Sequence, residues 1–408
     1  MQGISGSSMS GLNMNTTPVG ERASIVIFGC CNAGKSSLIN AITSQNIAIV
    51  SDIRGTTTDP VKKTMELLPF GPVVITDTPG LDDKSTLGTL RVEKSLDYIN
   101  QADLILFVVD ASREATSDEL TFLDKIKSSD KKYLIVGNKC DCEIIKNDLK
   151  VDIYVSALKD INIGKLKNMI SDILSAGKKE KTILGNMMKE KDIILLVTPI
   201  DASAPKGRLI LPQQQVIREV LDRHGIAIEV QVNEIKDVLG RIGNISLVIC
   251  DSQVFKEVDE AVPEDIPLTS FSIVFANYKG ALQSLYSAAK VLDTLKKGDR
   301  ILISEGCTHH RQCEDIGSVK IPKLVRKHTG LLNKDDLIFE FSSGGEFPKD
   351  VSMYKMIIHC GACMLNENQM KTRMKFARER EIPMTNYGIA IAYMNGILKR
   401  AMQPLKNI

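Results

Sequence analysis

The sequence predicts an α/β protein with three successive domains, each containing a sheet covered by helices. Three observations predict this fold. A glycine-rich phosphate-loop pattern follows a short apolar, β-branched run at residues 24–28. Strand-like and helix-like runs alternate through the middle of the chain, and two cysteine-containing segments each follow a strand-like run near the C-terminus. The 408 residues are enough for two or three domains of ordinary size.

The composition is that of an ordinary globular protein and argues against several classes of function. The apolar fraction is 43%, the charged fraction 25% and the net charge +2, so charge gives no support for binding to nucleic acid or to a membrane. No apolar run is long enough for a transmembrane helix. Residues 1–22 are rich in Ser, Gly, Asn and Thr and are predicted to be a disordered tail, not a secretory signal. We therefore expect a cytoplasmic protein whose cysteines bind metal or stay free.

The phosphate-loop pattern is GCCNAGKSS, at residues 29–37. It has the required context, because a strand precedes it and a helix-like run follows. Backbone N–H groups of such a loop surround phosphates, and the helix N-terminus adds a favourable dipole. Lys35 would neutralise the β and γ phosphates and the Ser36 hydroxyl would bind Mg²⁺. The predicted nucleotide-binding residues of this loop are Gly29, Asn32, Ala33, Gly34, Lys35, Ser36 and Ser37.

Two further segments complete the predicted phosphate and metal site. The run FGPVVITD ends at Asp77, whose carboxylate can hold Mg²⁺, and the amide of Gly80 shortly after it can reach the γ-phosphate. The segment GTTTD, at residues 55–59, can bring Thr57 to the metal. The predicted Mg²⁺ ligands are therefore Ser36, Thr57 and Asp77, and the predicted catalytic residues are Lys35, Asn32, Thr57 and Gly80.

The base is selected by the element NKCD, which contains Asn138, Lys139 and Asp141. Guanine presents N1–H and N2–H₂ side by side, and one carboxylate can accept from both. Adenine lacks this pair of donors, so a site built on Asp141 predicts GTP as the nucleotide, with a discrimination of about 10⁴-fold. Ser156 and Ala157, in the run VSAL, are predicted to complete the base site.

These motifs, in this order, resemble a translation-factor-class GTPase domain over residues 23–175. The resemblance implies a parallel sheet with helices on both faces. Two departures concern hydrolysis: Leu81 stands where Ras-like proteins carry a glutamine that orients water, and no arginine finger is identified in cis. In the potassium-activated GTPases that this stretch resembles, the asparagine at the position of Asn32 helps to hold a monovalent cation, which can replace the missing charge. Asn32 as a simple turn residue remains the alternative.

The middle of the chain contains no catalytic or ligand-binding motif that we can identify. A charged stretch suggests a linker at 176–189, and alternating strands and helices predict a small α/β domain at 190–270. This domain contains no phosphate loop and no convergent acid–base set. Assembly is the function we expect of it.

The C-terminal region, 271–408, contains a possible metal site. Cys307 and His309 follow one strand-like run, and Cys360 and Cys363 follow another. Thiolates select zinc, Cu(I) or iron–sulfur clusters. Geometry alone leaves open a structural zinc, an iron–sulfur cluster and metal-free buried cysteines. A surplus of possible fourth ligands favours a cluster with one exchangeable iron over a closed zinc site; these are His309, His310, Cys313, Glu314 and His359.

A GTPase domain, an α/β middle domain and the pattern Cys-x-His followed later by His-Cys-x-x-Cys together resemble the FeFe-hydrogenase maturation GTPase family, HydF, over nearly the whole chain. The resemblance implies a 4Fe–4S cluster held by Cys307, Cys360 and Cys363, with His309 or Glu314 as the candidate fourth ligand. It also implies a homodimer or higher oligomer, with dimerisation through the middle domain, 190–270. Its partners would be radical-SAM maturases, which build a two-iron precursor, and the apo FeFe-hydrogenase that receives it.

The alternative is a GTP-switched RNA-modification or ribosome-assembly protein with a structural zinc site. That hypothesis predicts a basic face with interleaved aromatic side chains. The chain has no Trp, 5% aromatic residues and a nearly neutral charge, which weighs against it. The sequence therefore favours a GTP- and cluster-binding protein with no nucleic-acid or membrane partner.

Overall fold

The computed structural model describes residues 22–44, 51–53, 61–81, 95, 97–145, 149–176, 182–200, 209–306, 315–344, 347–348, 350–362 and 365–405. The chain divides into two compact units, Met1–Leu174 and Ser175–Ile408. Among the described residues, no helix combines the length and the apolar character needed to cross a membrane.

The N-terminal unit contains a seven-stranded sheet in the order β2-β3-β4-β1-β5-β6-β7. Strands β4, β1, β5, β6 and β7 are parallel, as predicted. Strand β3, next to the edge strand β2, is antiparallel to β4, because a turn at residues 68–70 joins them and so short a connection cannot carry the chain back to start a parallel strand. The bounds are Ala23–Phe28 for β1, Ser51–Ile53 for β2, Lys62–Leu67 for β3, Gly71–Asp77 for β4, Leu104–Asp110 for β5, Lys132–Asn138 for β6 and Ile153–Tyr154 for β7.

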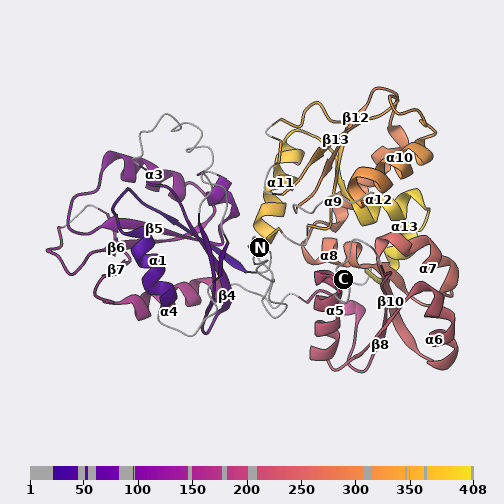
Figure 1. Cartoon of the computed structure of the whole chain (residues 1–408), viewed down its shortest axis with the longest axis horizontal. Coiled ribbons are helices and arrows are strands. Elements are labelled where there is room, and N and C mark those ends of the chain that lie inside the picture. Colours follow the sequence, from indigo (N-terminus) through magenta and orange to yellow (C-terminus); the bar gives the residue numbers. More distant parts are fainter. Residues whose placement is uncertain are drawn as a thin grey trace, which may run out of the picture. The chain divides into compact units, whose positions relative to one another are not determined.

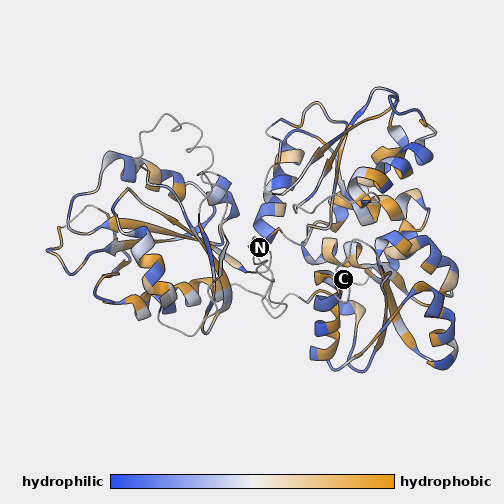
Figure 2. Cartoon of the chain, in the orientation of Figure 1, coloured by the Kyte–Doolittle hydropathy of each residue, from blue (hydrophilic) through white to orange (hydrophobic). Residues whose placement is uncertain are grey.

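Helices cover both faces of this sheet. Side chains alternate along β1 and β5, so that successive residues enter two different cores. Helices α1 (Lys35–Ser44) and α4 (Ile163–Ser175) close one core, and α3 (Ser117–Lys127) closes the other. The predicted sheet with helices on both faces is confirmed for this unit, and Figure 2 shows how hydrophobic residues concentrate in its strands.

The C-terminal unit contains two parallel four-stranded sheets (Figure 1). The first has the order β11-β10-β8-β9 and is covered by helices α5 to α8. The apolar run SFSIVFAN belongs mostly to helix α8, which packs on this sheet. The bounds are Ile193–Val197 for β8, Leu211–Asp222 for α5, Ile226–Val230 for β9, Ile235–Arg241 for α6, Ile245–Cys250 for β10, Phe255–Ala261 for α7, Leu268–Ser270 for β11 and Phe271–Tyr278 for α8.

The second sheet has the order β13-β12-β14-β15. It shares one continuous hydrophobic core with the first, in which Leu195 and Val248 join Leu302 and Ile357. The bounds are Leu282–Ala289 for α9, Arg300–Ser304 for β12, Ile321–Thr329 for α10, Ile338–Ser342 for β13, Met356–His359 for β14, Glu367–Glu379 for α11, Met384–Asn386 for β15, Tyr387–Met394 for α12 and Leu398–Ala401 for α13. A π-helical turn, Ile316–Lys320, precedes α10.

The second sheet has a topological switch point. The chain runs from β12 outward to β13, then returns to the other side of β12 for β14 and continues to β15. Ligands of open parallel sheets bind beyond the carboxyl ends of the strands at such a point. Here that point lies between the ends of β12 and β14, where Ser304 and His359 are in register.

Candidate functional site

The phosphate loop between β1 and α1 has the backbone that its glycines require. Gly34 lies in the left-handed region at φ 88°, and a Cβ there would come within 2.2 Å of Asn138 Nδ2. Asn138 is buried and ties the loop to the base site, since Nδ2 donates to the Ala33 carbonyl at 3.0 Å and Oδ1 accepts from the Ala157 N–H at 3.1 Å. A predicted base-site residue therefore also braces the loop.

Two polar side chains of the loop are placed for phosphate and metal chemistry. Lys35 is buried, and its Nζ donates to the carbonyls of Gly29 at 2.9 Å and Cys30 at 3.0 Å. Ser36 Oγ donates to Asp77 Oδ2 at 2.7 Å. The other oxygen, Asp77 Oδ1, is buried and has no hydrogen-bond partner among the described residues. A hydroxyl beside a carboxylate with an unsatisfied buried oxygen is a donor set that fits Mg²⁺.

The base-selecting carboxylate is exposed and ready to accept hydrogen bonds. Asp141 follows β6, and the hydroxyl of Ser156 holds the pKa of its carboxyl below the usual value. An ionised carboxylate accepts two hydrogen bonds and donates none, which matches the N1–H and N2–H₂ of guanine. The predicted pair of Ser156 and Asp141 thus meets in space although fourteen residues separate it in the chain.

Lys139 of the same element has a partner that the sequence did not indicate. It lies in the left-handed region at φ 67°, and its Nζ is 2.6 Å from Asp110 Oδ2 at the end of β5. Burial acts to raise the pKa of Asp110, but hydrogen bonds from Lys139 and Ser112 outweigh burial and lower it. The strand register explains the contact, because it pairs Asp110 with Asn138 and so places the two strand ends side by side.

The hydrolytic part of the site is described only in part. Asn32 is exposed and left-handed at φ 62°, a conformation that asparagine adopts more easily than most residues. Leu81 packs against the core under β1 and its N–H donates to the Gly29 carbonyl at 3.3 Å. Its apolar side chain cannot orient water. Gly80 lies directly before it, while Thr57 lies outside the described residues.

The predicted iron–sulfur site is a separate site in the C-terminal unit. Of its three predicted cysteine ligands, Cys360 is described by the structure, and it follows β14 at the switch point. Its sulfur accepts hydrogen bonds from the Gly306 N–H at 3.1 Å and the Ala362 N–H at 3.4 Å. Gly306 follows β12, so the two central strands meet at this sulfur. Ala362 is left-handed at φ 54°, a costly conformation for alanine. Two N–H groups directed at one sulfur stabilise a thiolate, and this environment fits a cluster ligand.

The other predicted ligands Cys307, His309, Glu314 and Cys363 lie outside the described residues. No group of three metal-binding side chains comes together within the ranges that the structure describes. His359, a further possible ligand, is buried, with Nδ1 2.9 Å from the Cys360 carbonyl oxygen and Nε2 2.9 Å from Arg373 Nη1. Both ring nitrogens therefore take part in hydrogen bonds within the fold.

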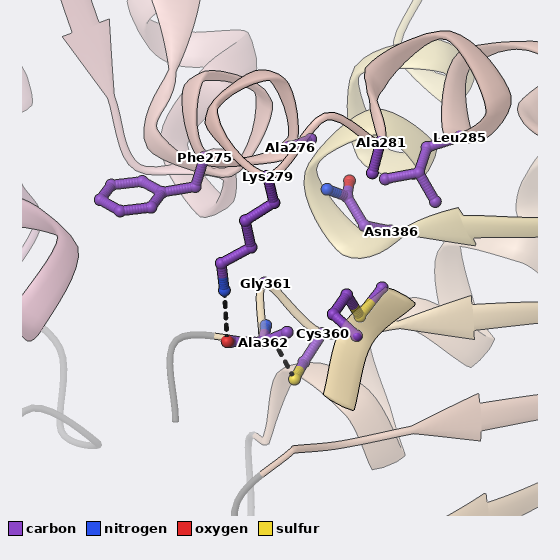
Figure 3. Close-up of a pocket in the computed structure, with 10 residues that line it drawn as sticks. Phe275, Ala276, Lys279, Ala281, Leu285, Cys360, Gly361, Ala362 and Asn386 are labelled. Atoms are coloured by element: carbon purple, nitrogen blue, oxygen red, sulfur yellow. Dashed lines mark hydrogen bonds between the residues drawn. The ribbon is translucent and has the colours of Figure 1, made fainter. Parts of the chain in front are cut away.

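A small pocket adjoins the Cys360 turn on the side of α8 (Figure 3). Lys279, which follows α8, extends toward the turn and its Nζ donates to the Ala362 carbonyl at 2.5 Å. Asn386, at the end of β15, also lines the pocket. The end of helix α8 thus contributes a cation directly to the cysteine turn.

Three buried or half-buried polar residues around Cys360 were missed by sequence reasoning. They are Glu305, Tyr387 and Arg373. The Tyr387 hydroxyl donates to Glu305 Oε1 at 3.1 Å, and burial raises its pKa well above the usual value. Arg373 was detectable, because it lies on the buried stripe of α11 with Met370 and Ala377, where spacing of three and four residues predicts apolar side chains.

Cys250 and several methionines of the C-terminal unit belong to its hydrophobic cores. Cys250 is fully buried, and burial raises the pKa of its thiol well above the usual value. Cys30 is buried and Cys31 exposed. Met370 and Met384 lie in the shared core of the C-terminal unit, with Met374 packed against it.

Models of known families match three parts of the chain. The hydrogen maturase F tetramerization domain matches residues 283–404, and the hydrogen maturase F dimerization domain matches residues 183–280. A third model, the 50S ribosome-binding GTPase, matches residues 24–139. The first two together cover more than half of the 408 residues.

Curated relatives match over a shorter length. The tRNA modification GTPase MnmE of Aquifex aeolicus (strain VF5) is 38% identical over 165 residues, which cover 39% of this chain and 36% of that protein. MnmE of Clostridioides difficile (strain 630) is 34% identical over 185 residues, covering 43% and 40%. The chain therefore spans well under half the length of these relatives.

Solved structures match part of the chain at low TM-scores. The G domain of the T. maritima FeoB iron transporter is 25% identical with a TM-score of 0.29, covering 37% of this chain and 98% of that one. An Aquifex aeolicus Era variant bound to GDP and aluminium fluoride is 18% identical with a TM-score of 0.30, covering 54% and 98%. At these TM-scores the likeness adds nothing to the domain matches.

Proposed function

Because the chain belongs to the hydrogen maturase F (HydF) family, we propose that it is a GTPase that holds a 4Fe–4S cluster and delivers a two-iron precursor to apo FeFe-hydrogenase. The chain has a GTPase domain and the two assembly domains of a hydrogenase maturase. The relatives named tRNA modification GTPases match over a length close to that of the GTPase domain alone, so they give no support to an RNA function here.

The observation that carries the proposal is the position of Cys360. Its sulfur lies at the switch point of the C-terminal sheet and accepts two backbone N–H groups. Cys307 would bring a second thiolate from the end of β12, and Cys363 a third from the same turn. When bound, the cluster supplies an electron-carrying site with one exchangeable iron, for which His309 and Glu314 are the candidate ligands. Cys360, fixed at the carboxyl end of the sheet, would orient the cluster.

In the N-terminal unit the residues perform GTP hydrolysis by positioning and charge. Lys35 would turn from the Gly29 and Cys30 carbonyls to the β and γ phosphates, and Ser36, Thr57 and Asp77 would hold Mg²⁺, which neutralises the phosphate charge. Water attacks the γ-phosphorus, the bond to the β,γ-bridging oxygen breaks, and GDP and phosphate leave. The Gly80 amide would bind the γ-phosphate during this step.

Selection of guanine predicts a switch in nucleotide preference. Asp141→Asn should lower the preference for GTP by about 10⁴-fold and favour xanthosine triphosphate, because the asparagine amide donates to the 2-oxo group of xanthine. The measurement is competition between the two nucleotides in a binding assay. Asp130→Asn changes another exposed carboxylate of the same unit and should have no effect. Unchanged GTP selectivity in Asp141→Asn would remove Asp141 from the base site.

Hydrolysis should be slow and should depend on the monovalent cation. We expect a rate in potassium at least about tenfold above that in sodium, because a cation held by Asn32 would supply the charge that no arginine provides. Asn32→Gly keeps the left-handed backbone while removing the amide, and should abolish the difference. Equal rates of the wild type in the two salts at matched ionic strength would defeat the cation hypothesis.

The assembly domains predict a homodimer or a higher oligomer. We propose that the dimer forms through the middle domain, that radical-SAM maturases supply the precursor, and that apo FeFe-hydrogenase receives it. Anaerobic purification tests the whole proposal. Brown protein with a broad absorbance near ~400 nm, which activates apo-hydrogenase after incubation with the maturases, is the expected result. Colourless protein with one zinc would instead support the structural-zinc alternative.

A further inference from the structure

Arg373 is a buried cation beside the cysteine turn. Its side chain is 6% exposed, on the stripe of α11 that otherwise consists of Met370 and Ala377. A buried charge is costly unless an opposite charge compensates it. The location therefore needs an explanation beyond packing.

The hydrogen bonds of Arg373 within the described part of the chain are all with uncharged groups. Nη2 donates to the Gly344 carbonyl at 2.7 Å, and Nη1 lies 2.9 Å from His359 Nε2 and 3.5 Å from Ser304 Oγ. The guanidinium carbon is 5.1 Å from the centre of the Phe347 ring. Among the described residues, no carboxylate forms an ion pair with Arg373.

Two other arginines of this chain that are at least partly buried have carboxylate partners. Arg400 pairs with Asp259 at 2.8 Å, and Arg113 pairs with Glu119 at 2.8 Å. For Arg373, burial lowers the pKa, and the charge that acts in the opposite direction is that of Cys360. The negative charge that stabilises the Arg373 guanidinium is therefore that of the Cys360 sulfur.

A short hydrogen-bonded chain connects Arg373 to the cysteine turn. A guanidinium only donates, so His359 Nε2 must accept, and a carbonyl only accepts, so His359 Nδ1 must donate to Cys360. The hydrogen-bond pattern thus assigns the histidine proton to Nδ1 and leaves no ring lone pair for a metal. Ser304 and His359, which both contact Arg373, end the two strands that meet at the Cys360 sulfur.

We propose that Arg373 is the charge partner of the anionic iron–sulfur group held at Cys360, and that it raises the reduction potential of this group. The inference rests on the proposed function. A cluster bound by thiolates is anionic and gains another negative charge on reduction. A fixed cation in a low-dielectric environment stabilises the reduced form more than the oxidised one.

The test uses three variants of the full chain, purified anaerobically. Arg373→Gln keeps hydrogen-bond donors and removes the charge, and Arg373→Lys keeps the charge. Arg380→Gln is the matched control, since Arg380 follows the same helix, is exposed and lies 3.5 Å from the Phe376 ring centre. Iron content and the midpoint potential are measured, the latter by a redox titration followed by electron-spin resonance.

Arg373→Gln should change the reduction equilibrium about tenfold toward the oxidised form, a shift of about 59 mV to more negative potential. Arg373→Lys should stay close to the wild type, and Arg380→Gln should equal it. If Arg373→Gln loses iron while Arg373→Lys keeps the cluster at its normal potential, the charge role is also supported.

Two results would overturn the inference. They are an unchanged potential in Arg373→Gln and equal loss of iron from both Arg373 variants. Both leave the proposed function standing if the wild type binds a cluster. A wild-type protein without iron would refute both.

Discussion

Replacing Cys360 with alanine is expected to remove the bound iron completely while leaving GTP hydrolysis within about twofold of the wild type. The sulfur at this position accepts two N–H groups and lies where β12 and β14 end, and no other described cysteine lies in the C-terminal sheet to take its place. Loss of one of three thiolates exposes iron to water and oxidation. Iron analysis and the absorbance of anaerobically purified protein measure the effect.

The same loss is expected for Cys307→Ala and Cys363→Ala. Cys142→Ala is the matched control, because Cys142 is an exposed cysteine of the N-terminal unit, and it should retain all the iron. Iron that remained bound in a variant lacking Cys307, Cys360 and Cys363 together would refute the assignment of this site.

The fourth position should behave differently from the three cysteines. An imidazole or carboxylate exchanges more readily than a thiolate, and a carrier needs one weakly held position to accept and release a second iron unit. His309→Ala or Glu314→Ala should therefore keep the 4Fe–4S spectrum, change its electron-spin signal and impair hydrogenase activation. Wild-type behaviour of both variants would place the fourth ligand elsewhere or make it solvent.

The nucleotide half was predictable because its residues follow local rules. A strand, a glycine-rich loop and a helix occur in immediate succession, so Gly34, Lys35 and Ser36 are placed by the backbone of their own segment. Asp77 and Asn138 end parallel strands, and the carboxyl ends of such strands gather at one edge of the sheet. Sequence order alone therefore predicts their convergence.

The environment of Cys360 was less predictable because long-range pairings create it. Gly306 reaches this sulfur across 54 residues, and Arg373 reaches Ser304 across 69. Contacts between residues so far apart in the sequence produce no periodic pattern from which they could be predicted. The shared core that joins the middle sheet to the C-terminal sheet was missed for the same reason, since Leu195 and Ile357 give only the pattern of ordinary buried strands. The arginine on an apolar helix stripe was the one local signal available.

Replacing Lys35 with alanine is expected to lower the rate of GTP hydrolysis by about 10²–10³-fold. The lysine is buried inside the loop and donates to two of the loop's own carbonyls. The loop thus already contains the cation that the developing negative charge on the phosphate requires. Among the described residues of the loop, Lys35 is the only lysine. The measurement is single-turnover phosphate release at saturating GTP. Ser36→Ala should instead raise the Mg²⁺ concentration needed for half-maximal rate, because it removes the hydroxyl that pairs with Asp77.

Lys125→Ala is the control for this pair of variants, since Lys125 is exposed in the last turn of α3. This variant should hydrolyse GTP at the wild-type rate. Because the nucleotide and cysteine residues lie in different units of the chain, Lys35→Ala should keep its full iron content. Hydrolysis within a few-fold of the wild type would exclude Lys35 from phosphate stabilisation. Loss of iron together with hydrolysis would show instead that the two units depend on each other, and that GTP binding contributes to holding the cluster.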